Sequence, residues 1–175
     1  MSPKAATFHS WLGTLFGHSE LQVRRLLDDE AALHFLMAWS LFESKCFGGF
    51  VRAAKIECYA RLTSKSIAAA TLPDAAEHFH ARYQDSKLFE NLMHEQRNER
   101  LSSLLKAHFA NLTTEDRLFF LVFVIYRYRN NIFHGNKGVM SWLHYREQIQ
   151  YCIAAMQFMV SHAEQIKPTM KAWVA

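Results

Sequence analysis

The chain has few of the residues that break up regular structure. Its 175 residues include 6 Gly and 3 Pro, against 14 Phe and 7 Met. A fold of many short strands needs more turn residues than this. No run alternates between apolar and polar residues for long enough to predict a strand. We therefore expect an all-α fold.

Cysteine is also scarce, and its spacing does not suggest a metal site. Cys46, Cys58 and Cys152 are an odd number with no CxxC pair and no Cys/His spacing of the zinc kind. We interpret them as buried thiols of a protein in a reducing compartment. The sequence predicts no metal site and no cofactor.

Long hydrophobic runs are absent as well. The most apolar stretch, LFFLVFVIY from Leu118 to Tyr126, is far shorter than the roughly 20 residues that a membrane span requires. The first twenty residues lack the continuous apolar segment of a signal peptide. We expect a cytoplasmic protein with no membrane partner. The net charge of +4 gives only mild support to an anionic partner, because the basic residues are scattered.

Start and stop signals predict a single domain over residues 1–175, a bundle of six or seven helices with a peripheral first segment, 1–18. Ser19 with Gln22, and Thr113 with Asp116, form capping-box patterns. The helices are expected at about 5–16, 19–47, 50–64, 73–95, 97–109, 113–134 and 139–166. In the second of these, a stripe at helical spacing is expected to face the core; it comprises Leu26, Leu33, Met37, Ser40 and Leu41.

The helix that contains LFFLVFVIY ends in a polar segment, RNNIFHGNKG. Asn130 and His134 are four residues apart and share a helix face, with Arg127 one turn earlier in the same row. Arg129 precedes His134 by five residues, about 140° away around the helix. The group offers a guanidinium for phosphate, a titratable imidazole and an orienting amide.

These groups match the needs of RNA cleavage without a metal ion. The attacking 2′-hydroxyl must lose a proton, the leaving 5′-oxygen must gain one, and charge on the phosphate oxygens must be stabilised. One His and one Arg supply much of this. Two copies of the pair across a symmetric dimer supply it more completely.

The segment RNNIFHG resembles the Arg-x4-to-6-His motif of HEPN domains, particularly bacterial HEPN proteins of the Apea-like kind. The resemblance implies an all-α bundle whose penultimate long helix ends in the motif. It also implies a metal-independent endoribonuclease with a toxin or phage-defence role, which acts as a homodimer under the control of an antitoxin or other regulatory protein. The matching residues are Arg129, Asn130 and His134. We predict that Arg129 binds the phosphate, Asn130 orients the other two side chains and His134 transfers protons.

Other residues are assigned supporting roles. Glu43, from an earlier helix, is expected to orient the motif, with Asn131 also in support, and Lys137 and Arg127 are candidates for RNA binding. Simpler roles stay open: Arg129 and His134 as a cationic helix end before Gly135, and Glu43 as a solvated or capping residue. The alternative function is a non-catalytic HEPN-like module that binds RNA or protein.

Overall fold

The structure is a computed structural model, and it describes residues 7–68, 72–133 and 145–165. Within these ranges the chain forms nine α-helices, one short 3-10 helix and no strand, which confirms the all-α expectation. The α-helices are α1 (Phe8–Phe16), α2 (Glu20–Leu27), α3 (Glu30–Phe47), α4 (Ala53–Thr63), α5 (Ala75–Arg82), α6 (Ser86–Met93), α7 (Glu99–Lys106), α8 (Thr114–Phe133) and α10 (Arg146–Gln165). The 3-10 helix η2 covers Phe109–Asn111.

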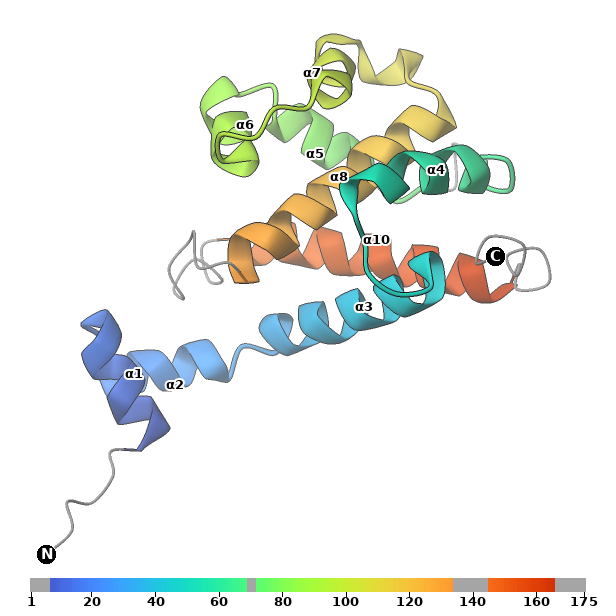
Figure 1. Cartoon of the computed structure of the whole chain (residues 1–175). Coiled ribbons are helices and arrows are strands. Elements are labelled where there is room, and N and C mark those ends of the chain that lie inside the picture. The colour runs from blue at the N-terminus through green and yellow to red at the C-terminus, as the bar shows by residue number, and fades with distance from the viewer. Residues whose placement is uncertain (1–6, 69–71, 134–144, 166–175) are drawn as a thin grey trace, which may run out of the picture.

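Helix α8 lies at the centre of the bundle (Figure 1). It packs against α4, α5, α6, α7 and α10, while α10 in turn packs along α3. Every residue from Leu118 to Ile125 is buried, as expected of a helix that is apolar on all sides. The start of α8 carries the predicted cap, since Asp116 N–H donates to Thr113 Oγ1 at 3.1 Å. The central helix thus holds the polar segment at its end in a fixed place.

The count of six or seven helices is wrong, because two of the expected helices are each divided into two. The capping box of Ser19 and Gln22 does open α2, but that helix ends at Leu27 and Asp29 caps a new one by accepting from Ala31 N–H. In the same way, Asp85 accepts from Leu88 N–H and opens α6 after α5 has ended. The carboxylate of Asp accepts hydrogen bonds from nearby backbone N–H groups, in competition with the backbone carbonyls of a helix, so Asp favours a helix start over a helix interior.

The buried face of α3 is not the one predicted. Leu33 and Met37 are each 57% exposed and Leu41 is 49% exposed. The residues of α3 that enter the core are Phe35, Trp39, Phe42 and Cys46. Because α3 carries large apolar residues on both sides, its periodicity alone does not select the face that packs on α10.

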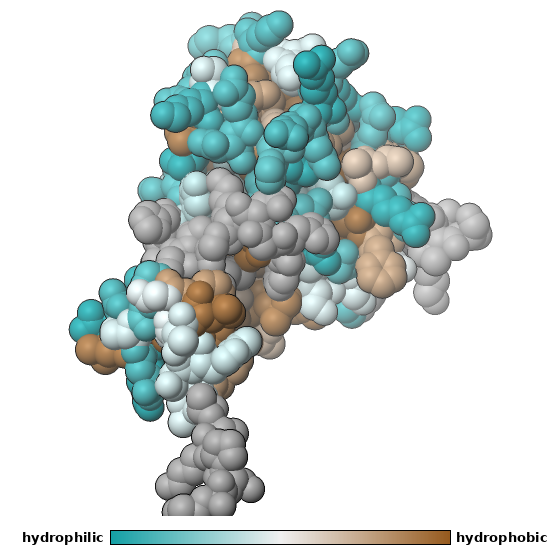
Figure 2. All heavy atoms as spheres, turned by 60° about the vertical axis from the view of Figure 1, so that its left-hand side comes forward, coloured by the Kyte–Doolittle hydropathy of each residue, from teal (hydrophilic) through white to brown (hydrophobic). Residues whose placement is uncertain are grey.

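Helices α1 and α2 form an arm that extends away from the bundle (Figure 1). They pack on one another and bury Leu12, Val23 and Leu26, which are not part of the main core cluster. Gly13 permits their close approach, since a Cβ there would lie 2.6 Å from the carbonyl oxygen of His18. Large apolar side chains stay exposed on the arm, among them Phe8, Trp11 and Leu15, and Figure 2 shows apolar surface gathered on this lower part of the molecule.

Two of the three cysteines are buried as expected, Cys46 and Cys152, whereas Cys58 is exposed on α4. Burial raises the pKa of the Cys46 thiol to about 12, so this side chain stays neutral in the core. Among the helices that the structure describes, none has the length and apolar character to cross a membrane.

Candidate functional site

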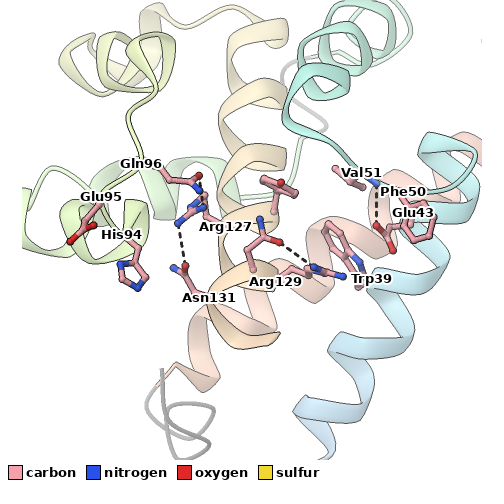
Figure 3. Close-up of a pocket in the computed structure, with 12 residues that line it drawn as sticks. Trp39, Glu43, Phe50, Val51, His94, Glu95, Gln96, Arg127, Arg129 and Asn131 are labelled. Carbon is pink, nitrogen blue, oxygen red and sulfur yellow. Dashed lines mark hydrogen bonds between the residues drawn. The ribbon is translucent and has the colours of Figure 1, made fainter. Parts of the chain in front are cut away.

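A cavity of about 480 Å³ lies along the last turns of α8. Its wall is formed by α3, the turn between α3 and α4, the loop between α6 and α7, and α8 itself. In Figure 3 the turn that carries Phe50 and Val51 and the loop that carries His94 and Glu95 stand on opposite sides of α8. Segments far apart in the sequence therefore meet at the polar end of the central helix.

Arg129 and Asn130 line this cavity together. The guanidinium of Arg129 lies over the indole ring of Trp39, with its Cζ atom 5.7 Å from the ring centroid, within the range of a cation–π interaction. Arg129 Nη1 also donates to Asn130 Oδ1 at 3.2 Å. Trp39 is 4% exposed, so the ring is a fixed support and Asn130 orients the fork of the guanidinium.

Glu43 lines the same cavity from α3. Its Oε1 accepts from Val51 N–H at 3.1 Å, and its backbone carbonyl accepts from Gly49 N–H at 3.0 Å. The chain turns there because Gly48, with φ 62°, adopts the left-handed conformation that ends α3. Glu43 is thus both a capping residue and a member of the cavity wall, and it holds in place the turn that carries Phe50.

Arg127 and Asn131 also reach the cavity wall, but they are 3% exposed and act on the protein itself. Arg127 donates from Nε to Leu92 O at 3.2 Å, from Nη2 to Met93 O at 2.7 Å, and from Nη1 to Gln96 Oε1 at 2.7 Å. Asn131 accepts from Arg127 at 3.3 Å and donates to Leu92 O at 2.9 Å. Burial lowers the pKa of the Arg127 guanidinium, which remains charged.

These contacts form a clamp from α8 onto the end of α6. We expected Arg127 to contact RNA and Asn131 to support the motif. The placement of Arg127 favours a structural role, since its donors are directed at the Leu92–Gln96 segment. Asn131 supports the site by completing that clamp.

The clamped loop holds two residues in an unusual backbone conformation. His94 has φ 46° and Glu95 has φ 65°, and they are the positive-φ residues other than glycine within the described ranges. This conformation costs a residue with a Cβ on the order of 1 kcal/mol. His94 ends α6, where its N–H donates to Glu90 O at 2.9 Å, and both side chains are exposed and line the cavity.

Two of the sequence-predicted site residues, His134 and Lys137, lie outside the described residues. Of the others, the structure brings Arg129, Asn130 and Glu43 to one cavity. His94, Glu95, Trp39 and Phe50 were not among the site residues predicted from the sequence. They come from a loop, a core helix and a turn, and short motifs do not reveal such neighbours.

Comparison of the chain with models of protein families, with curated proteins and with solved structures found no match. The cavity offers a guanidinium for an anion such as phosphate, an imidazole for proton transfer, two carboxylates and an exposed aromatic ring.

Proposed function

We propose that the chain is a metal-independent endoribonuclease of the HEPN type. The observation that carries the proposal is the cavity in which Arg129 and Asn130, from the motif RNNIFHG, meet Trp39 and Glu43 from a distant part of the chain. A chance match to a short motif gives no reason for its Arg to be supported on a buried ring and oriented by the next residue. Such support is what positions a functional side chain.

In the reaction, the 2′-hydroxyl oxygen attacks the adjacent phosphorus and forms a new P–O bond, while the bond from phosphorus to the 5′-oxygen breaks. The products are a 2′,3′-cyclic phosphate and a 5′-hydroxyl. Arg129 binds the phosphate oxygens as they gain negative charge, and Asn130 holds the guanidinium of Arg129 in position. His134 moves one of the two protons, and Glu43 fixes the adjacent turn.

An exposed aromatic side chain at the cavity favours a single-stranded nucleic acid as the ligand. Phe50 is 74% exposed on the turn that follows Gly48 and Gly49, and it lines the cavity. An exposed ring that lines the same cavity as an arginine is a platform on which a base can stack while the phosphate is bound, worth about 1–3 kcal/mol per base. A purely structural end of α8 has no use for it.

We further propose that two copies associate through the exposed apolar face of the arm and α3. The exposed large apolar residues of α1, α2 and α3 define this face; they are Phe8, Trp11, Leu15, Phe16, Leu21, Leu27, Leu33, Leu36, Met37 and Leu41. With each side chain about half exposed, they present on the order of 900 Å² of apolar surface in total. This total is similar to the roughly 800 Å² that each partner buries in a standard interface.

The apolar face adjoins the cavity. On α3, Leu36 precedes Trp39 by three residues and Trp39 precedes Glu43 by four, so Trp39 lies between Leu36 and Glu43 along one side of the helix. A second copy bound there would stand at the cavity rim, as the composite cleft of a HEPN dimer requires. A toxin or phage-defence role, with an antitoxin or other regulatory partner, belongs to the same proposal and is supported by the resemblance.

Cleavage of a labelled single-stranded RNA in excess EDTA tests the function. Wild type should cut it, Arg129→Ala and His134→Ala should lose at least about 100-fold in rate, and Asn130→Ala should lose less. Arg61→Ala is the matched control, since Arg61 is an exposed arginine on α4 and its loss changes the net charge by the same amount. The control should cut at the wild-type rate.

The same samples distinguish the alternative function. If the folded wild type cuts nothing, or if Arg129→Ala cuts as fast as wild type, the ribonuclease proposal is lost. RNA binding without cleavage, abolished in Arg129→Ala and retained in His134→Ala, would indicate a non-catalytic binding module.

A further inference from the structure

We infer that His94 is a proton-transfer group of this cavity, acting on single-stranded RNA opposite Arg129. The inference rests on the proposed function. That function requires one group to accept the proton of the 2′-hydroxyl and another to donate a proton to the 5′-oxygen. The imidazole of His94, which lines the cavity together with Arg129, can perform one of these two transfers.

The position of His94 suits this task. A proton carrier must reach the 2′- or the 5′-oxygen while the guanidinium binds other oxygens of the phosphate, so the two groups act from different sides of the phosphate. The cavity is open between two walls, one from the α6–α7 loop with His94 and one from α3 with Trp39 and Glu43 (Figure 3). Arg129 lies over Trp39, so a phosphate bound there has His94 on the far wall.

The backbone conformation of His94 also supports a functional role. A helix that ends in the left-handed conformation usually does so with Gly or Asn, yet here two successive residues with larger side chains adopt it, with φ 46° and 65°. The strain is held by Arg127 and Asn131, which bind the carbonyl groups of Leu92 and Met93 just before His94. A clamp of buried side chains that maintains a strained histidine on a cavity wall indicates a use for the imidazole.

The loop also separates two hollows. His94, Glu95 and Gln96 line the first cavity and also a second one of about 1220 Å³ along α6 and α7. A single strand that passes from one to the other crosses His94. The charged groups that line the first cavity with His94 are Glu43 from α3, Glu95 from the loop, and Arg127 and Arg129 from α8.

The left-handed backbone makes a clean experiment possible, because glycine and asparagine favour it. His94→Gly and His94→Asn should fold at least as well as wild type, with an equal or higher Tm. In EDTA both should cut RNA about 100-fold more slowly or worse, and the pH–rate profile should lose one limb. Loss of the ascending limb would identify a base and loss of the descending limb an acid. Added imidazole should restore part of the rate of His94→Gly.

His108→Asn is the matched control, since it removes an exposed imidazole at the start of η2, away from the cavity, and asparagine can still cap that helix; it should cut RNA at close to the wild-type rate. Wild-type activity of His94→Gly, or an equal loss in His108→Asn, overturns the role of His94 and leaves the proposed function standing. If wild type itself cuts nothing while Arg61→Ala and wild type are both folded, the proposed function and this inference fall together.

Discussion

Replacing Arg127 by Met should lower the free energy of unfolding by about 3 kcal/mol. The guanidinium is 3% exposed and makes four hydrogen bonds, to Leu92 O, Met93 O, Gln96 Oε1 and Asn131 Oδ1. Hydrogen bonds of a charged group contribute about 1.5–3 kcal/mol each when their partners are buried. The sum overstates the loss for two reasons that the structure supplies.

First, the acceptors keep other donors, because Leu92 O still accepts from Asn131 Nδ2 and Met93 O from Gln96 N–H. Second, burial opposes the charge of Arg127 and lowers its pKa, so its removal also relieves a desolvation cost. The net value of about 3 kcal/mol corresponds to a fall in Tm of roughly 6–12 °C for a chain of this length. Chemical denaturation followed by circular dichroism measures it directly.

Arg129→Met is the matched comparison, since it makes the same substitution two residues further along α8. Arg129 is only partly buried and contacts Trp39 and Asn130, so its removal should cost less than about 1 kcal/mol. Its RNA cleavage should nevertheless fall far more than that of Arg127→Met measured below the melting temperature. Equal destabilisation by the two substitutions, or a larger loss of cleavage for Arg127→Met, would refute this division of roles.

Four further outcomes are expected. Burial raises the pKa of Asp116, but hydrogen bonds from Thr113 and Arg100 outweigh this effect and lower that pKa. The stabilisation that Asp116 provides is therefore present above about pH 4 and lost at lower pH. Acid titration of Arg100→Gln should show a smaller loss of unfolding free energy than that of wild type. Burial lowers the pKa of His78 from 6.5, so the unfolding free energy should fall as pH falls below about 6.5, less steeply in His78→Phe. Phe50→Ala should raise KM for RNA about tenfold and Phe50→Tyr should not; equal KM values for the two would remove the stacking role. Leu33→Glu with Met37→Glu should convert a dimer to a monomer in sedimentation analysis, whereas Lys55→Glu, an exposed site on α4, should not; a monomeric wild type contradicts the proposed interface.

Local signals in the sequence were sufficient for much of the fold. The cap at Ser19 and the central position of the segment from Leu118 to Ile125 follow from neighbouring residues, and the structure confirms both. The breaks at Asp29 and Asp85 were missed because apolar periodicity continues across them, while the competing signal is a single capping side chain. The exposed stripe on α3 was mistaken for core because burial depends on the packing partner, α10, which periodicity does not identify.

The candidate site divides in the same way. The motif RNNIFHG pointed to Arg129 and Asn130, and the cavity contains both. The motif did not show that Arg129 and Arg127 have different roles. That difference depends on where each side chain points around α8 and on which residues it meets there. His94 could not be associated with them from the sequence, because it joins the cavity through a clamp made by Arg127 and Asn131, which lie more than 30 residues later in the chain.

The most direct test of the central claim is the chemical identity of the product ends. A single-stranded RNA of defined sequence, incubated in excess EDTA and analysed by mass spectrometry, should yield fragments with a 2′,3′-cyclic phosphate and a 5′-hydroxyl from wild type and none from Arg129→Ala. Intact RNA after incubation with folded wild type, ends that carry a 5′-phosphate, or the same fragments at the same rate from Arg129→Ala would contradict cleavage in the Arg129 cavity.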